Sequence, residues 1–320
     1  MKISVLGCGR WGTFLAAYHS RKNDVLLWGR PESAHFAALC RERKNEYLTL
    51  PDALQLDSDL DRALRFADVV IISIGAQQLR SLASQINARN VAGKTFILCM
   101  KGVEENTGER LTEVFREIVK QPVHVAVWVG PGHVEDFEAG IPNCMVVDSD
   151  EPEVVDTIVN ELSSDLIRLY KGHDLIGTEI GAAAKNVIGI AAGMLDGVGY
   201  SSLKGALMAR GAREISRLIK AMGGDELSAY GLCHLGDYEA TLFSQHSHNR
   251  MFGEQFARGN HYDKLAEGAY TVRALVALGE KYQVDLPICH MVDDLLYAGY
   301  PMEKALPILF ARSVKGEFET

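Results

Sequence analysis

The sequence predicts an α/β protein, with a doubly wound, mostly parallel sheet in its N-terminal part and an all-α C-terminal part. Three observations support this fold class. A glycine-rich turn joins the first predicted strand to the first predicted helix. Short apolar runs then alternate with helical segments, as in parallel α/β sheets. From Asp174 onward the strand-like runs stop. We therefore expect one domain over residues 1–175 and a second, helical domain over residues 176–320.

The first predicted strand, Lys2–Leu6, leads directly into Gly7-Cys8-Gly9-Arg10-Trp11-Gly12. In this G-x-G-x-x-G pattern the first glycine permits a tight turn, the second lets the backbone approach a pyrophosphate, and the third lets helix and strand pack closely. The N-terminus of the following helix, Thr13–Ser20, offers N–H groups and a favourable dipole to phosphates. The pattern predicts a Rossmann-type dinucleotide-binding domain. The alternative is a glycine-rich turn that binds no ligand.

The second predicted strand, Asp24–Trp28, ends at Gly29-Arg30. An NAD-selective site usually carries an acidic residue here to bind the ribose 2′-hydroxyl, and this chain has none. Arg30 is placed to meet a 2′-phosphate instead. We therefore favour NADP over NAD, with NAD tolerated. The alternative is that Arg30 is a solvated turn residue.

The later predicted strands are buried and rich in β-branched residues. In sheets of this kind ligands bind beyond the carboxyl ends of the strands. Lys101 and Gly130 each follow such an end, so we expect both at the ligand site. The predicted strands are Ala67–Ile74, Thr95–Cys99, His124–Val129 and Cys144–Val147, with helical stretches at 32–46, Gln78–Ile86 and Gly108–Val119.

The second half of the chain reads as helices separated by proline and glycine boundaries, including Pro287 and Pro301. No strand-like run interrupts them. The predicted helices are Gly177–Leu195, Lys204–Met222, Phe252–Arg258, Thr271–Tyr282 and Cys289–Ala298.

Lys185 lies in a run of glycine, alanine and aliphatic residues over 177–193. Because desolvation disfavours a charged ammonium, a lysine held there is a candidate for proton transfer. The alternative is that its ammonium reaches water from a buried helix. A nicotinamide enzyme needs one acid or base, and Lys185, Lys101 and Asp237 have that character. Asp237, in a glycine-bracketed loop, can pair with a lysine. Pairing raises the lysine pKa and burial lowers it, and the sequence leaves the balance open.

Composition argues against several kinds of partner. The net charge is −9, with 33 basic and 42 acidic residues and no basic block, which argues against nucleic acid and anionic membranes. The chain enters a strand at its first residues, leaving no room for a signal segment, and no uninterrupted apolar run approaches the ~18 residues that span a bilayer. We therefore expect a cytoplasmic protein.

Cysteine and histidine spacing indicates no metal site. The 6 cysteines lie far apart without a CxxC pair, which favours reduced thiols over a disulfide framework or zinc. His246-Ser247-His248 matches no recognised zinc spacing, and we interpret His246 as a surface-loop residue.

Taken together, these motifs resemble the NAD(P)-dependent glycerol-3-phosphate dehydrogenases of bacteria. The resemblance spans most of the chain, and the segment KNVIGIAAG within it is highly specific. The matching stretches are GxGxWGT at Gly7–Thr13, LWGR at Leu27–Arg30, Lys101-Gly102 with Glu104, Gly130-Pro131, EIGAAAKNVIGIAAGMLDGVG at Glu179–Gly199, Arg210-Gly211, Leu235-Gly236-Asp237, Asn249-Arg250, Glu267-Gly268 and Leu286-Pro287-Ile288.

The resemblance implies reversible reduction of dihydroxyacetone phosphate, a small three-carbon phosphate, to sn-glycerol 3-phosphate for glycerophospholipid synthesis. The family is cytoplasmic and commonly dimeric. By position, Lys185 matches the proton-transfer lysine, Lys101 a substrate-binding lysine, and Asp237 the carboxylate beside them. The implied substrate-binding set is Lys101, Gly130, Asn186, Thr241, His248, Asn249 and Arg250, and the implied cofactor-binding set is Gly7, Gly9, Arg10, Trp11, Gly12, Arg30, Lys101 and Glu267.

The chain departs from the family pattern on the substrate side. Gly132 replaces a serine, threonine or asparagine, His248 replaces an arginine, and an asparagine is missing near Tyr200–Lys204. Histidine is monodentate and only partly charged near neutral pH, so the change weakens anion binding unless Arg250 or Lys204 compensates. Two further hypotheses follow. One is a diverged dehydrogenase for another polyol phosphate or small hydroxy acid. The other is a non-catalytic NAD(P)-binding sensor.

Overall fold

The computed structural model describes residues 1–311 and residue 316. The chain folds into two compact units. Unit 1 comprises Met1–Met100, Leu111–Trp128 and Gly132–His173, and unit 2 comprises Lys101–Arg110, Val129–Pro131 and Asp174–Thr320. Segments 101–110 and 129–131, expected in the N-terminal domain, therefore belong with the helical unit.

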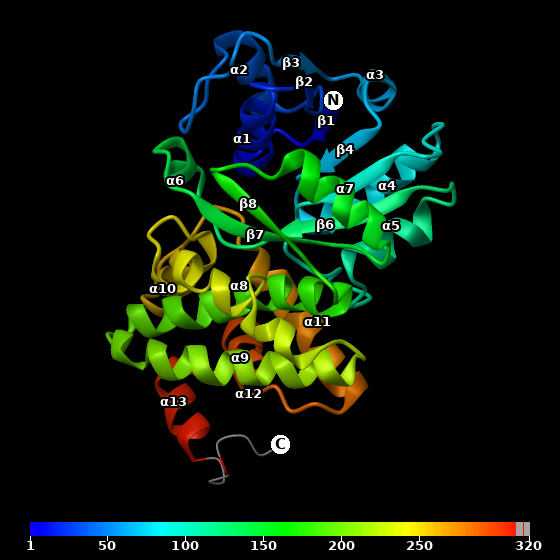
Figure 1. Ribbon diagram of the computed structural model, residues 1–320. Coiled ribbons are helices and arrows are strands. Elements are labelled where there is room, and N and C mark those ends of the chain that lie inside the picture. The colour runs from blue at the N-terminus through cyan, green and yellow to red at the C-terminus, as the bar shows by residue number, and fades with distance from the viewer. Residues whose placement is uncertain (312–315, 317–320) are drawn as a thin grey trace. The chain divides into compact units, whose positions relative to one another are not determined.

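An eight-stranded sheet forms the centre of unit 1, which confirms the predicted doubly wound α/β architecture. The spatial order is β3-β2-β1-β4-β5-β6-β7-β8, and strand order reverses beside β1 (Figure 1). The pairs β1–β2, β1–β4, β2–β3, β4–β5, β5–β6 and β7–β8 are parallel. The strands are β1 (Lys2–Leu6), β2 (Asp24–Trp28), β3 (Gln55–Asp57), β4 (Val69–Ile72), β5 (Thr95–Leu98), β6 (His124–Val129), β7 (Asn143–Asp148) and β8 (Ile167–Lys171).

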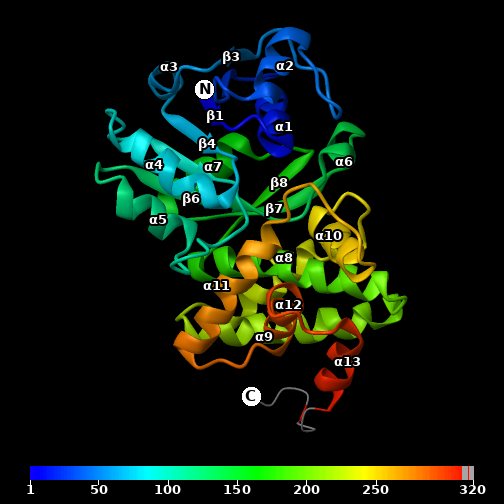
Figure 2. The same cartoon turned by 180° about the vertical axis from the view of Figure 1, so that it is seen from behind.

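Helices cover both faces of this sheet, as Figures 1 and 2 show from opposite sides. Val5 of β1 shares a buried cluster with Phe14 of α1 and Val155 of α7. Ser4 points to the opposite face, where its hydroxyl donates to the carbonyl oxygen of Ala63 in α3 at 2.6 Å. The helices of this unit are α1 (Arg10–His19), α2 (Ala34–Glu42), α3 (Leu60–Phe66), the 3₁₀ turn η1 (Ala76–Gln78), α4 (Leu79–Asn87), α5 (Leu111–Ile118), α6 (Val134–Glu138) and α7 (Pro152–Leu162).

Two strands and several element ends differ from the predictions. β3 has only 3 residues, and β8 alternates buried and exposed positions, so neither shows the continuous apolar run of the central strands. Strand β4 is shorter than predicted because Ala67 still ends α3. Helix α2 is shorter than the charged stretch 32–46. Ser33 caps its first turn by accepting from the Phe36 N–H, and Arg43 ends it at a φ of 53°.

Unit 2 is helical, as predicted, and α8 is its central element. The helices α9, α10, α11 and α12 pack around α8 (Figures 1 and 2). Helix α13 was not predicted, and α10 begins four residues earlier than predicted because Ser247 caps it. The elements are α8 (Leu175–Gly197), η2 (Ser201–Leu203), α9 (Lys204–Ala221), η3 (Glu226–Tyr230), η4 (Leu235–Asp237), the π-helical turn η5 (Glu239–Phe243), α10 (His248–Ala257), α11 (Glu267–Tyr282), α12 (Pro287–Tyr297) and α13 (Met302–Phe310).

Glycines let neighbouring backbones approach α8 closely. A Cβ atom added at Gly193 would lie 1.9 Å from the carbonyl oxygen of Arg250. One added at Gly253 of α10 would lie 2.1 Å from the carbonyl oxygen of Ile190. Both distances are too short for any side chain, so the α8–α10 contact requires glycine on both helices.

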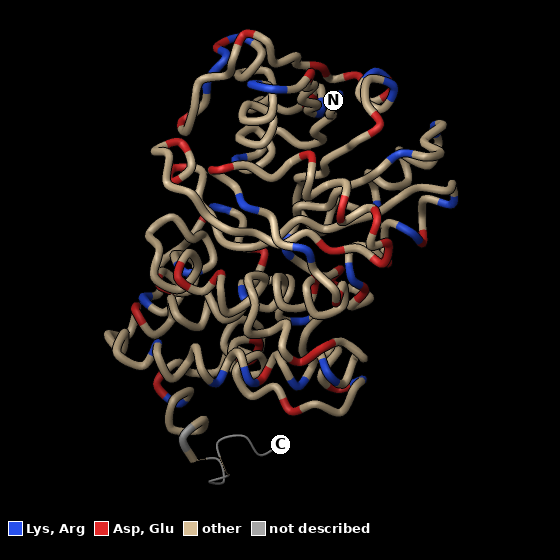
Figure 3. Tube along the Cα trace, viewed as in Figure 1, with Lys and Arg blue, Asp and Glu red and all other residues tan. Residues whose placement is uncertain are grey.

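Helix α8 is long and apolar enough to cross a membrane by length and composition, although Glu179 and Lys185 interrupt the run. In the structure 89% of the 18-residue stretch of α8 that has this composition is buried, as in the core helix of a soluble protein. Figure 3 shows the positions of basic and acidic residues interspersed along the backbone of each unit.

Candidate active site

Lys185, near the middle of α8, is buried beside two polar side chains. Its Nζ donates to Oγ1 of Thr241 at 2.7 Å and lies 3.1 Å from Oδ2 of Asp237. The Lys185 side chain is 10% exposed and that of Asp237 is 2% exposed. Thr241 lies in the π-helical turn η5, a rare geometry that is frequent at functional sites. The lysine is therefore held in place and does not extend freely into water.

A second ammonium shares the same carboxylate oxygen. Nζ of Lys101 lies 2.6 Å from Oδ2 of Asp237 and donates to the carbonyl oxygen of Gly130, also at 2.6 Å. The Asn186 side-chain amide donates to the carbonyl oxygen of Lys101 at 2.9 Å and so fixes that backbone. Two lysines around one carboxylate leave a net positive site, which favours an anionic or strongly polarised ligand.

Burial lowers the pKa of Lys185 to about 8. Desolvation is the largest cause, the Asp237 carboxylate opposes it, and the Lys101 ammonium adds to it. The sequence did not show whether burial or pairing with Asp237 has the larger effect on the pKa of Lys185. In the structure burial has the larger effect. A lysine with a pKa near 8 can both donate and accept a proton close to neutral pH, as a general acid or base requires.

The residues of α8 that form the site lie on one face of this helix. Residues four apart lie above one another on a helix, so Gly181, Lys185 and Gly189 share one face. A Cβ atom added at Gly189 would lie 2.7 Å from Cγ2 of Thr241 and 3.4 Å from Cβ of Asn249. Glycine at this position therefore lets both predicted pocket residues approach α8 one turn beyond the lysine.

In unit 1 the glycine fingerprint has the geometry that a pyrophosphate requires. Gly7 has a φ of +116°, and a Cβ atom there would lie 2.1 Å from the carbonyl oxygen of Ser73. A Cβ atom at Gly12 would lie 2.1 Å from the carbonyl oxygen of Gly7. At Gly9, by contrast, no atom of the described residues lies within 4 Å of an added Cβ, and none of their side chains caps α1. The backbone at Gly9 is thus open to a phosphate group.

Two side chains of the fingerprint shape its surroundings. Arg10 forms an ion pair with Glu135 and stacks over the ring of Tyr47, with its guanidinium 4.9 Å from the ring centroid. Trp11 packs against Phe137, with ring centroids 5.9 Å apart. Through these contacts Arg10 and Trp11 help to hold the glycine-rich loop that follows β1.

Two further predicted cofactor residues occupy different units. Arg30, in unit 1, has a side chain that is 57% exposed, and its Nε lies 3.6 Å from Oε1 of Glu32. Glu267, in unit 2, begins α11. The N–H of the next residue, Gly268, donates to Oδ1 of Asn249 at 2.9 Å. Asn249 therefore also fixes the start of α11.

Arg250 and Lys204, the cations expected to compensate for the missing arginine, bind the same carboxylate. Nη1 of Arg250 and Nζ of Lys204 lie 2.8 and 2.6 Å from Oδ2 of Asp196. Arg250 also pairs with Glu254 at 2.8 Å. A bound anion would have to compete with these carboxylates. No sequence signal indicated Asp196, because its partners lie on other elements.

His248, the substituted position, is the first residue of α10. Its Nδ1 lies 2.6 Å from the hydroxyl oxygen of Tyr262, and this contact orients the imidazole. Among the residues that the structure describes, no three histidine, cysteine, aspartate or glutamate side chains gather as metal ligands would.

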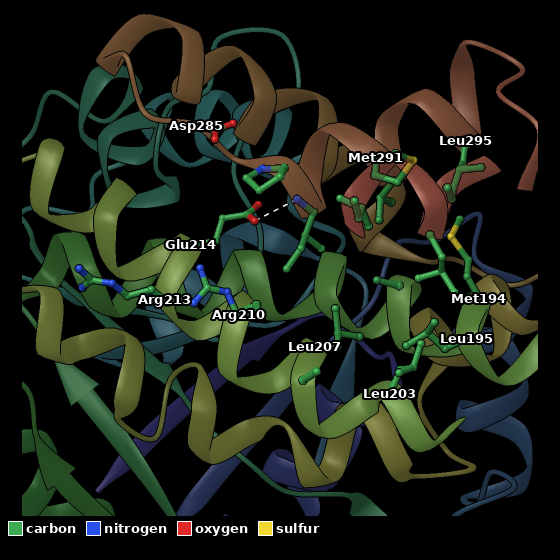
Figure 4. A pocket seen from close by; sticks show the side chains of 18 of the residues that line it. Met194, Leu195, Leu203, Leu207, Arg210, Arg213, Glu214, Asp285, Met291 and Leu295 are labelled. Carbon is green, nitrogen blue, oxygen red and sulfur yellow. Dashed lines mark hydrogen bonds between the residues drawn. The ribbon is translucent and has the colours of Figure 1, made fainter. Parts of the chain in front are cut away.

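The large groove of unit 2 is separate from this site. It has a volume of 1670 Å³ and lies among α8, α9, α12 and α13, and neither Lys185 nor Asp237 lines it. Glu214 on its wall accepts from the N–H groups of Ile288 and Cys289 at 2.9 and 3.0 Å, capping α12, and burial raises its pKa to about 7. Figure 4 shows apolar side chains at one end (Met194, Leu195, Leu203, Leu207, Met291, Leu295) and polar ones at the other (Arg210, Arg213, Glu214, Asp285).

A dinucleotide fingerprint on a doubly wound sheet, combined with a buried lysine–aspartate pair, defines a nicotinamide-dependent oxidoreductase. Residues 2–155 match the family model described as NAD-dependent glycerol-3-phosphate dehydrogenase N-terminus, and residues 174–307 match the corresponding C-terminus model. The chain belongs to the NAD-dependent glycerol-3-phosphate dehydrogenase family, which confirms the resemblance seen in the sequence.

Full-length relatives agree with this assignment. The chain is 37% identical to glycerol-3-phosphate dehydrogenase [NAD(P)+] of Prosthecochloris aestuarii, over 99% of this chain and 100% of the relative. It is 35% identical to the enzyme of the same name from Chlorobium phaeobacteroides, over 99% of both chains. A crystal structure of glycerol-3-phosphate dehydrogenase from Coxiella burnetii matches with a TM-score of 0.90 at 28% identity, covering 97% of this chain and 99% of that one.

Proposed function

We propose that this protein uses NADPH or NADH to reduce dihydroxyacetone phosphate to sn-glycerol 3-phosphate, and that it also catalyses the reverse reaction. One observation supports this most strongly: Lys185 is buried 3.1 Å from Asp237 with a pKa of about 8. The named relatives are glycerol-3-phosphate dehydrogenases that use NAD or NADP. The pair supplies the acid that reduction of a ketone needs.

The nicotinamide supplies hydride to the carbonyl carbon when it is bound. Lys185 then gives the proton from its Nζ to the carbonyl oxygen, so that the ketone becomes an alcohol. Asp237 keeps the ammonium oriented, and Thr241 accepts its hydrogen bond at 2.7 Å. Lys101 stabilises the negative charge that develops on the oxygen or holds the phosphate. In the oxidative direction neutral Lys185 accepts the hydroxyl proton.

The residues of unit 1 fit a dinucleotide. The backbone from Gly7 to Gly12 and the uncapped N-terminus of α1 would hold the pyrophosphate. The exposed Arg30 would meet a ribose 2′-phosphate, and no acidic residue follows β2 directly to select the hydroxyl of NAD. These features favour NADP while leaving NAD usable.

The substrate pocket would be formed by Asn249, Asn186, Thr241 and His248. The side chains that would bind the phosphate are His248 and Arg250. Because Arg250 already pairs with Asp196, Arg250 can bind a phosphate only if that pair rearranges. The family assignment also supports a cytoplasmic homodimer that feeds glycerophospholipid synthesis. Light scattering coupled to size-exclusion chromatography measures the oligomeric state directly.

A spectrophotometric assay tests the function. We expect dihydroxyacetone phosphate to drive oxidation of NADPH, and more slowly of NADH, with no turnover when substrate is omitted. Absence of any substrate-dependent oxidation would refute the proposal and favour the non-catalytic sensor.

One observation favours a second candidate, a diverged dehydrogenase for another polyol phosphate or small hydroxy acid. His248 replaces the family's arginine, and both neighbouring cations are paired with Asp196. The same assay with a panel of small ketones separates the two candidates. A kcat/KM for another ketone above that for dihydroxyacetone phosphate would support divergence.

A further inference from the structure

His234 and Tyr238 form a fully buried hydrogen-bonded pair directly beside Asp237. Both side chains are 0% exposed. Nδ1 of His234 lies 2.8 Å from the carbonyl oxygen of Gly181, and its Nε2 lies 2.6 Å from the hydroxyl of Tyr238. The two rings meet edge to face, with centroids 4.8 Å apart. No step of the mechanism uses either residue.

The partners determine the protonation state of the imidazole. A backbone carbonyl only accepts hydrogen bonds, so Nδ1 of His234 must carry the proton and donate to Gly181. Burial lowers the pKa of His234 to about 4, so the ring is neutral at physiological pH and Nε2 has no proton. Nε2 therefore accepts from the hydroxyl of Tyr238. The Gly181 carbonyl thus sets the tautomer, and the hydroxyl of Tyr238 donates to the nitrogen that this tautomer leaves without a proton.

This bond connects the two halves of the proton-transfer pair. In an α-helix the carbonyl of Gly181 is also the acceptor for the N–H of Lys185, four residues later. On the other side, the backbone N–H of Asp237 donates to the carbonyl oxygen of His234 at 3.0 Å. The histidine is therefore joined through its side chain to the helical turn of Lys185 and through its main chain to Asp237.

The packing at this contact leaves little space for adjustment. A Cβ atom added at Gly181 would lie 2.9 Å from Sγ of Cys233 and 3.1 Å from Cβ of His234. The loop that carries Asp237 thus lies directly on the α8 backbone. A loop held so closely, with its buried imidazole bonded at both nitrogens, has a defined position relative to Lys185.

We propose that His234 is a positioning residue that sets the separation of Asp237 from Lys185, with the hydroxyl of Tyr238 holding its second ring nitrogen. The inference rests on the proposed function, since it assigns these residues a role in placing the acid. It adds a specific dependence: the strength of Lys185 as an acid is controlled by a hydrogen bond that the reacting groups do not make.

The groups that face Lys185 determine what a loss of positioning does. Asp237 raises its pKa, Lys101 lowers it, and Thr241 accepts its hydrogen bond. If the loop moves away from α8, the contribution of Asp237 weakens while burial remains. The pKa of Lys185 then falls further below its usual range. Because reduction requires the protonated lysine, the rate would begin to fall at a lower pH than in the wild type.

The test compares four substitutions in the full-length protein. His234→Leu removes both side-chain hydrogen bonds at similar volume. His234→Asn is the matched control, because an asparagine amide can place an N–H where Nδ1 was and keep the bond to Gly181. Tyr238→Phe removes only the hydroxyl. His173→Leu, at an exposed position in unit 1, controls for the change of residue type.

We expect His234→Leu to lower kcat for dihydroxyacetone phosphate by about 10- to 100-fold, as misplacement of a catalytic group does, with KM for NADPH unchanged. Its alkaline limb should move to lower pH, Tyr238→Phe should show a smaller change of the same kind, and His234→Asn should recover most of the activity. Equal impairment in His234→Leu and His234→Asn with an unmoved pH profile would overturn the proposal and assign His234 a packing role.

A structural measurement keeps the inference separate from the proposed function. Crystal structures of the wild type and His234→Leu give the distance from Lys185 Nζ to Asp237 Oδ2, which is 3.1 Å here. A separation that stays unchanged in the variant would refute positioning whatever the substrate is. Should His234→Leu fail to fold, Tyr238→Phe gives the same two readouts. Absent turnover in the wild type would count against the proposed function alone.

Discussion

Replacing Asp237 by asparagine removes one negative charge while leaving shape and volume nearly unchanged. The carboxylate oxygen lies 3.1 Å from Lys185 Nζ and 2.6 Å from Lys101 Nζ. In the variant, burial and the nearby Lys101 ammonium still act on the pKa of Lys185, and the Asp237 carboxylate no longer opposes them. Both effects lower the pKa of Lys185 below its present value of about 8.

Coulomb's law gives the size of the change. At an effective dielectric of about 20, two unit charges separated by about 3 Å interact by about 5 kcal/mol, or about four pKa units. Because Asp237 is shared between Lys185 and Lys101, we take about half of this, a fall of about two units. A pKa near 6 would leave about one hundredth of Lys185 protonated at pH 8 and about one tenth at pH 7.

The assay is the initial rate of NADPH oxidation with saturating dihydroxyacetone phosphate from pH 6 to 9. Asp237→Asn should fall about 50-fold below wild type at pH 8, about tenfold at pH 7 and only about twofold at pH 6. Glu239→Gln, the same chemical change at an exposed position two residues away, should leave the profile unchanged. A deficit of the same size at every pH would refute the reasoning, because it would show that Asp237 does not act through the acid strength of Lys185.

Three other predictions concern the cofactor and the fold. Arg30→Asp should weaken NADPH binding about tenfold or more, as loss of a charge-assisted bond does, and should weaken NADH binding much less. Fluorescence titration with both cofactors checks this. Equal losses of affinity for both would show that Arg30 does not bind the 2′-phosphate. Gly253→Ala should destabilise the protein by about 2 kcal/mol or more, since its Cβ would meet backbone at 2.1 Å, whereas Gly205→Ala, with open space among the described residues, should be neutral or stabilising in urea unfolding. His19 and His234 have folded-state pKa values of about 4, below the unfolded value of about 6.5. The unfolded chain therefore binds more protons between these values, and stability should fall as the pH drops from about 6.5 to about 4, by on the order of 3 kcal/mol per histidine. His234→Asn should lose about half of this pH dependence in thermal melts, and an unchanged slope would contradict the assignment.

Much of the fold could be predicted because its signals are local. The central strands of unit 1 are buried, mostly apolar runs that contain many β-branched residues, and the fingerprint from Gly7 to Gly12 encodes a turn geometry in consecutive residues. Strand β3, with three residues, and the edge strand β8 lack such a run. They are strands because a neighbouring strand pairs with them, which their own residues do not specify.

The candidate site could be predicted only in part, for the same reason. Lys185 is conspicuous as a charge in an apolar helix. The bond between Lys101 and Asp237 joins residues 136 positions apart, so the family resemblance suggested it and spacing did not. No motif indicated His234, which resembles an ordinary loop residue until its contact with Gly181 is seen.

The pairing of Arg250 with Asp196 is a further contact that could not be predicted from the sequence. A sequence can show that a cation lies near a predicted pocket, but it cannot show that a carboxylate on another helix already binds it. For this chain the buried Lys185–Asp237 pair and the dinucleotide fingerprint are well defined by geometry. The phosphate-binding side is where the sequence departs from its family.

The most direct test of the central claim is single-turnover reduction by Lys185→Met, followed in a stopped-flow instrument with NADPH already bound. Methionine keeps the apolar stem and removes the proton that Lys185 would donate. We predict that the variant binds NADPH as tightly as wild type, while hydride transfer to dihydroxyacetone phosphate slows by at least about 100-fold and loses its pH dependence near pH 8. Wild-type rates in Lys185→Met would contradict the claim that this lysine is the acid.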